Sequence, residues 1–172
     1  LIPTFPEVNS TNNNIAFVDK ANGSDATGTV GDQTRPFSTI KAAVAAASLS
    51  TPSVVLVSEG IYNEANPITV PANVQIVGKT GTLGWVQTEI IPLDPLQDVI
   101  LMTGNGAGVT GVTVTVPTAT DKGAIVYNGP NGTTASVTFV GIRGQAGSTS
   151  AGIYVRCAST GKIISFENRY RG

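Results

Sequence analysis

The sequence Gly123-Ala124-Ile125-Val126-Tyr127 is repeated in similar form as Ala151-Gly152-Ile153-Tyr154-Val155. Ile125 and Ile153 occupy equivalent places in the two copies, and the step between them lies in the twenties. A period of that size with two or three short strands per turn is typical of stacked coils, because each coil buries its apolar side only against its neighbours. The repeat therefore predicts a β-solenoid.

The rest of the chain after residue 53 fits the same architecture. Phe139 and Phe166, separated by a slightly shorter step, are expected to form a second pair of equivalent positions. Short apolar bursts alternate with Gly, Pro and Asn, and such bursts suit the sides of a coil better than a large sandwich. The bursts are 54–57, 68–70, 74–77, 89–91, 99–102, 112–116, 124–127, 137–140 and 163–166.

One segment has a helical period. Its apolar residues recur at three- and four-residue steps and predict an amphipathic helix over 37–48; they are Phe37, Ile40, Val44 and Ala47. Ser38 is the expected N-cap, and the preceding Pro36 cannot continue a helix backwards. The first coil of a solenoid exposes an apolar cross-section and unpaired strand edges, so we expect this helix to cover them as an N-terminal cap.

Composition limits the partners of the chain. Of its 172 residues 12% are charged, and the net charge is −1 with acids and bases scattered singly. No positive field attracts nucleic acid or an anionic membrane, so neither partner is expected. Cys157 lies in a strand-like run and is expected to pack rather than to react.

The expected organisation is an extended arm or linker over 1–14 followed by one β-helix domain over 15–172. The arm contains two prolines and a polar run that cannot bury enough apolar surface to order itself. At the other end Ile163, Ile164 and Phe166 have no cover comparable to the helix. We therefore expect a continuation of the chain or a partner subunit there.

The segment 17–78 carries a series of motifs: Phe17-Val18-Asp19, Asn22-Gly23-Ser24-Asp25, Arg35-Pro36-Phe37-Ser38-Thr39-Ile40-Lys41-Ala42-Ala43, Gly60-Ile61-Tyr62-Asn63-Glu64 and Val74-Gln75-Ile76-Val77-Gly78. This series resembles the N-terminal entry of pectin-lyase-like β-helix proteins. In that superfamily a Gly-Ser-Asp loop leads to a Pro-Phe-x-Thr-Ile helix that plugs the open end, and a Gly-x-Tyr-x-Glu turn closes the first coil. The resemblance implies an all-β fold, a right-handed parallel β-helix with an N-terminal capping α-helix.

The same superfamily contains pectate lyases, polygalacturonases and pectin methylesterases, which use calcium-binding carboxylates, paired carboxylates, or two Asp residues with an Arg. This chain has eleven acids and no histidine, and no acid lies between Asp121 and Glu167. The other acids are expected in turns, including Glu64, and none of the family's catalytic motifs can be placed on them. Asp19, Asp25 and Asp32 do not have the spacing of a calcium loop and are interpreted as turn residues. We predict no catalytic residue, no cofactor and no metal site.

Four aromatic residues are candidate glycan contacts, because an aromatic face packs on a sugar ring without charge: Trp85, Tyr62, Tyr127 and Tyr154. The alternative for Trp85 is packing over a coil corner. Four arginines in the last two coils could align into a stripe that binds an acidic sugar; they are Arg143, Arg156, Arg169 and Arg171. The alternative is a solvated surface or an ion pair with Glu167.

The expected function is a structural β-solenoid module of a viral or cell-surface particle protein, located on a virion or an extracellular surface. Its expected partners are further copies of itself in a trimer, neighbouring particle proteins, or a polysaccharide. Two alternatives stay open. One is the N-terminal fragment of a polysaccharide lyase, hydrolase or esterase, and the other is a carbohydrate-binding module whose glycan affinity falls on Trp85→Ala.

Overall fold

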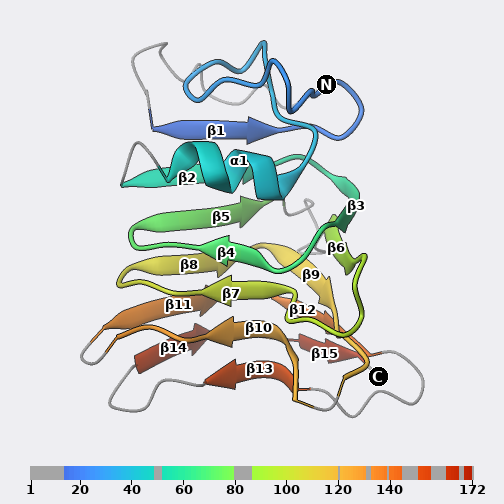
Figure 1. Ribbon diagram of the computed structural model, residues 1–172, viewed down its shortest axis with the longest axis vertical. Coiled ribbons are helices and arrows are strands. Elements are labelled where there is room, and N and C mark those ends of the chain that lie inside the picture. The colour runs from blue at the N-terminus through green and yellow to red at the C-terminus, as the bar shows by residue number, and fades with distance from the viewer. Residues whose placement is uncertain are drawn as a thin grey trace.

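Short strands stacked one above another build the protein (Figure 1). The computed structural model describes residues 14–48, 52–79, 87–119, 121–130, 133–138 and 140–144, and the strand backbones of 151–155, 162–166 and 169–171. The predicted arm over 1–14 therefore lies outside the described residues except for Asn14. Among the described residues no helix has both the length and the hydropathy needed to cross a membrane.

The strands form three sheets, and every strand pair is parallel. The six-stranded sheet has the order β1 (Ile15–Val18), β2 (Ser53–Val57), β5 (Val74–Gly78), β8 (Ala107–Thr110), β11 (Thr134–Thr138) and β14 (Lys162–Phe166). The five-stranded sheet has the order β15 (Arg169–Arg171), β12 (Gly141–Arg143), β9 (Val112–Thr115), β6 (Thr88–Pro92) and β3 (Gly60–Glu64). The four-stranded sheet has the order β13 (Ala151–Val155), β10 (Gly123–Tyr127), β7 (Ile100–Met102) and β4 (Ile68–Val70). From β2 onward, successive strands along the chain go to the three sheets in turn, which is the arrangement expected of a β-solenoid.

The predicted repeat is confirmed where the register can be read. Ile125 pairs with Ile153, and the last coil keeps the same step along the sequence in the other two sheets. The predicted pairing of Phe139 with Phe166 is wrong, because Phe166 pairs with Thr138. Phe139 itself lies outside the described residues. Register partners in the last coil have the same sequence separation in all three sheets. Pairing of the two phenylalanines would require a separation that is one residue shorter.

The core lies between the three sheets. Along most strands, buried residues alternate with half-buried or exposed ones, because successive side chains point to opposite faces of a strand. Parallel pairing then places similar side chains of successive coils on top of one another. Ile68 pairs with Ile100, and Ile100 pairs with Ile125, and all three residues are 0% exposed. Such columns of aliphatic side chains hold successive coils together.

The helix α1 (Ile40–Ala47) is shorter than the predicted 37–48. Thr39, not Ser38, is the N-cap: its backbone is extended (φ −121°, ψ 148°), and its side chain accepts a hydrogen bond from the N–H of Ala42. Phe37 precedes the helix and forms a parallel bridge with Val18, with 4% of the residue exposed. The buried helix face is otherwise as expected, because Ile40, Val44 and Ala47 are all in the core.

The helix and the loop before it close the N-terminal end of the stack in different ways. α1 lies at that end and contacts β1, β2 and β4 (Figure 1). The loop pairs with the outer edge of β1: the carbonyl of Ile15 accepts from the N–H of Gly31 at 2.7 Å, and that of Phe17 from the N–H of Phe37 at 2.8 Å. The helix thus covers the apolar cross-section as predicted, whereas the loop covers the strand edge.

Candidate functional site

A group of hydrogen-bonded polar side chains lies around the N-terminus of α1. Glu64, the last residue of β3, is 1% exposed, because alternation along β3 turns Tyr62 and Glu64 inward. One carboxylate oxygen of Glu64 accepts the N–H of Ile40 at 2.7 Å, and the other accepts the N–H of Lys41 at 3.1 Å. The carboxylate thereby satisfies two N–H groups that have no partner inside the helix.

A second carboxylate supports the residues just before the helix. Asp25 accepts the N–H groups of Ser38 at 2.9 Å and Thr39 at 3.0 Å, together with the Thr39 hydroxyl at 2.8 Å. Asp25, Thr39 and Glu64 together bind every backbone N–H from Ser38 to Ala42. The motifs of the Gly-Ser-Asp loop, the helix and β3 therefore meet at one point.

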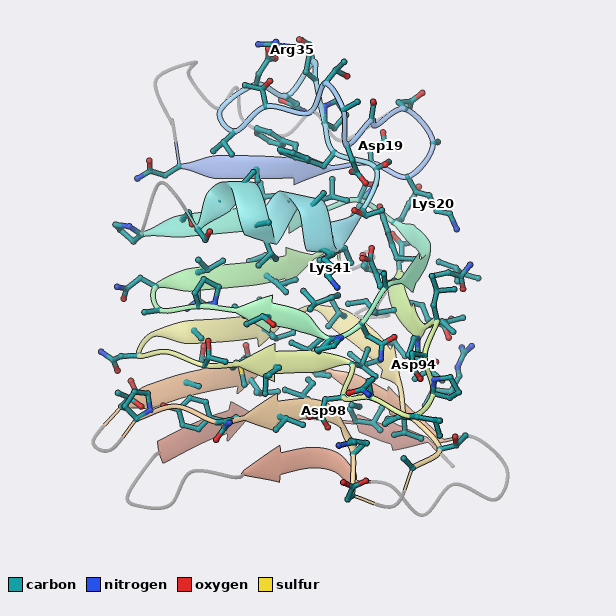
Figure 2. The ribbon with its side chains drawn as sticks, viewed as in Figure 1. Asp19, Lys20, Arg35, Lys41, Asp94 and Asp98 are labelled. Atoms are coloured by element: carbon teal, nitrogen blue, oxygen red, sulfur yellow. The ribbon has the colours of Figure 1, made fainter. Side chains whose placement is uncertain are left out.

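Two lysines and a tyrosine complete this group. Lys41 donates to the carbonyl of Ala65 at 2.6 Å, Lys20 donates to the carbonyl of Ile61, and the Tyr62 hydroxyl lies 2.9 Å from the Ser58 hydroxyl. Figure 2 shows Lys20 beside Asp19 in the loop after β1, and Lys41 at the start of α1. A hollow of about 250 Å³ lies here, lined by Lys20, Ser38, Thr39, Tyr62, Asn63 and Glu64.

The electrostatics of the group follow from burial and hydrogen bonding. Burial raises the pKa of the Glu64 carboxyl, and the N–H groups of Ile40 and Lys41 oppose that rise. Burial likewise raises the pKa of the Tyr62 hydroxyl. For Asp25, burial opposes ionisation, but the hydrogen bonds from Thr39 and Ser38 outweigh it and lower the pKa. Both oxygens of Glu64 accept backbone N–H groups of α1, so this carboxylate anchors the start of the helix.

The acids of the N-terminal loop divide between two roles. Asp19 accepts the N–H groups of Ala21 at 2.9 Å and Asn22 at 3.2 Å. Asp32 accepts the N–H of Thr34 at 2.9 Å and binds Arg35 at 2.7 Å. All three acids lie in or beside turns as predicted, and the side chain of Asp25 in addition holds the start of the helix. Within the described ranges no group of three or more His, Cys, Asp or Glu residues could hold a metal ion.

The free energy of unfolding is expected to fall in acid, between pH 3.8 and about 2. Hydrogen bonds from Thr34 and Arg35 lower the pKa of Asp32 from 3.8 to about 2, and the pKa values of Asp19 and Asp25 are also lowered. A carboxyl whose pKa is lower in the fold stabilises the fold above its unfolded pKa, and this contribution is lost as the pH falls through the folded value. Glu64, whose pKa is raised, contributes with the opposite sign: its protonation stabilises the fold, but at higher pH than the range in which Asp32 is protonated.

Circular dichroism melts from neutral pH down to about 2 measure this acid dependence. Asp32→Asn should show a smaller drop in midpoint over the acidic range than the unsubstituted protein. Identical pH profiles for the two proteins would contradict the assignment.

The four aromatic residues predicted as glycan contacts do not form one surface in the described structure. Tyr62 is 1% exposed and Tyr127 is 0% exposed, and the Tyr127 hydroxyl contacts the Thr133 hydroxyl. Both rings lie inside the coil and present no face on which a sugar could stack. Tyr154 pairs in register with Val126, but its side chain lies outside the description, as does Trp85.

The predicted arginine alignment is seen in part. Arg143 on β12 is the register partner of Arg171 on β15, and Arg169 is the partner of Gly141; Arg156 lies outside the described residues. The side chain of Arg143 bonds to Glu89 on β6 at 2.5 Å. Arg143 therefore has an acidic partner, which is Glu89 rather than the predicted Glu167; Glu167 lies outside the description.

Sequence reasoning missed the role of Glu64. The expectation that this acid lies in a turn is wrong, because it ends a strand and faces the core. The available signal was the spacing Gly60-x-Tyr62-x-Glu64: period-two alternation places Tyr62 and Glu64 on the same face. A carboxylate on an apolar face requires a buried partner, and the helix N-terminus is that partner.

The geometry defines a class: a mostly β protein of three parallel sheets with one short helix, consistent with a β-solenoid whose N-terminal end is closed. The model of one protein family, described as a protein of unknown function (DUF1565), matches residues 21–169. The chain belongs to this family. Comparison of the chain with curated proteins and with solved structures gave no match.

Proposed function

We propose that this chain is a structural β-solenoid module of a viral or cell-surface particle protein. In this proposal the coils form a right-handed parallel β-helix of the pectin-lyase-like kind, closed at its N-terminal end by α1. The module belongs on a virion or an extracellular surface, and it assembles as a trimer or with neighbouring particle proteins. Glycan contact stays part of the proposal through Trp85 and Tyr154.

The use of the buried carboxylates carries the proposal. Glu64 is 1% exposed, and each of its carboxylate oxygens accepts a backbone N–H of α1. Asp98 is 7% exposed and accepts the N–H of Gly123 at 3.0 Å. Groups of this kind would have to be free to move protons in a polysaccharide-degrading site. Here they fix loops and the helix to the coils, which is what a structural module requires.

The free edges of the stack supply an assembly surface. The sheets end on β13, β14 and β15, and in the part of the chain that the structure describes no strand pairs with the outer edges of these three. Parallel edge strands are templates for further pairing. In the proposal a further coil, from the same chain or from a neighbouring subunit, pairs there.

Sedimentation velocity at micromolar concentration tests the proposal. A trimer would support a particle module. A monomer that releases products from pectin or polygalacturonate would overturn it in favour of the enzyme fragment. A monomer without that activity would contradict the trimer and leave the carbohydrate-binding module, which a glycan array then tests.

A further inference from the structure

On β1, β2, β5, β8 and β11 of the six-stranded sheet, the residues that point away from the core are uncharged, and they are largely apolar toward the N-terminal end. The residues that point away from the core form two columns in register, which we call the outer columns. One column is Ile15, Val54, Gln75, Gly108 and Ser136, and the other is Phe17, Leu56, Val77, Thr110 and Thr138. Apart from Gly108, which is buried, these residues are half-buried. Apolar side chains gathered on one sheet face in this way make it a candidate contact surface.

A groove lies along the first of these columns. It has a volume of about 410 Å³, and its lining includes Asn14, Ile15, Val54, Gln75 and Gly106. This volume is in the range of small-ligand sites, ~300–1,000 Å³. The lining of the groove includes Asn14, which is the residue that joins the segment 1–13 to β1.

The sequence of that segment has a matching period. Ile2, Phe5 and Val8 recur every three residues, and Pro3 and Pro6 follow the first two of them. A polyproline II helix has three residues per turn and advances ~9.3 Å per turn, so these three side chains share one face. Strands lie ~4.8 Å apart, so two strand spacings span ~9.6 Å. An arm in this conformation, crossing the strands, would set one apolar side chain over every second strand.

We propose that residues 1–8 dock in this groove and across the outer columns of their own chain. The polar residues Asn9-Ser10-Thr11-Asn12-Asn13 connect this apolar part to Asn14 and span up to ~17 Å when extended, enough to reach the groove. The proposed contact is apolar on both sides. The outer columns contain no ionisable side chain, and residues 1–8 contain one, that of Glu7.

The size of the face favours an extended segment over a second folded copy. Five strands at ~4.8 Å and two columns of side chains give a face of roughly 300 Å². A stable interface between two folded proteins buries about 800 Å² on each. A single extended segment fits a strip of this width.

Cysteine accessibility tests the proposal. Cys157→Ser is introduced throughout so that each variant carries one thiol, placed by Val54→Cys in the groove or, as the matched control, by Thr113→Cys on the outer face of the five-stranded sheet. Each variant is prepared with and without residues 1–8, and its alkylation rate is measured under native conditions. We expect deletion to speed modification of Val54→Cys about tenfold, equivalent to ~1.4 kcal/mol of protection, and to leave Thr113→Cys unchanged. Phe5→Ala should speed Val54→Cys by less.

Three results would overturn the proposal. Equal rates at Val54→Cys with and without residues 1–8 would show that the arm does not cover the groove. Equal acceleration at Thr113→Cys would show a general loosening of the fold. Acceleration at Val54→Cys on dilution of the intact chain would show that the arm comes from another copy. Each result is separate from the sedimentation test, because an arm docked on its own chain is compatible with either oligomeric state.

Discussion

Ile125→Ala is expected to lower the free energy of unfolding by about 3 kcal/mol. Ile125 is 0% exposed and pairs with Ile100 on one side and Ile153 on the other. Truncation loses the transfer free energy of the removed methyl and methylene groups and leaves a cavity that rigid neighbouring coils cannot close. Chemical denaturation followed by circular dichroism measures the change.

Leu101→Ala is the matched control for this substitution. Leu101 lies on β7, the strand paired with β10, but is half-buried and is the register partner of Val126 rather than of Ile125. Its truncation should cost about 1 kcal/mol, because it creates no closed cavity. Equal losses in the two variants would mean that the aliphatic column does not hold the coils together.

The features predicted correctly from the sequence are those that repeat. The equivalence of Ile125 and Ile153 and the helical period of Ile40, Val44 and Ala47 both survive in the structure. Periodicity is reliable because it records which face is buried, whatever the partner. The predicted equivalence of Phe139 and Phe166 is wrong because it relied on the residue type alone. The residues around the two phenylalanines do not repeat, in contrast to those around Ile125 and Ile153.

The features that could not be predicted depend on contacts between distant segments. By residue type, Ser38 is a better N-cap than Thr39. Asp25, far back in the preceding loop, binds the N–H of Ser38, so the chain enters the helix one position later. Phe37 fits the helical period but is bound to β1 instead. In both cases tertiary contacts override a local preference.

The buried tyrosines show the same limit. A tyrosine in a strand is compatible with either face, because its ring is apolar and its hydroxyl is polar. Tyr62 and Tyr127 point inward because Ile90, the register partner of Tyr62, and Met102, the partner of Tyr127, are themselves buried. Register, which depends on loop lengths, therefore decides whether such a residue can touch a ligand.

Glu64→Gln is expected to lower the free energy of unfolding by about 2 kcal/mol, although it changes the volume of the side chain very little. The amide keeps one acceptor oxygen and turns a donor toward the N–H of Ile40 or Lys41, which leaves that buried donor unpaired. Thermal and chemical denaturation measure the loss, which should be larger still in Glu64→Ala.

Glu59→Gln is the matched control for Glu64→Gln, since its side chain is 58% exposed and lies 3.4 Å from Lys79. An exposed ion pair of this kind contributes little, so the control should change stability by less than about 0.5 kcal/mol. If Glu64→Gln were as mild as Glu59→Gln, the two hydrogen bonds to α1 would not be what closes the N-terminal end. The first N–H groups of α1 have no acceptor within the helix. A large loss of stability in Glu64→Gln alone would therefore mean that closure of the first coil depends on the carboxylate that β3 provides to these groups.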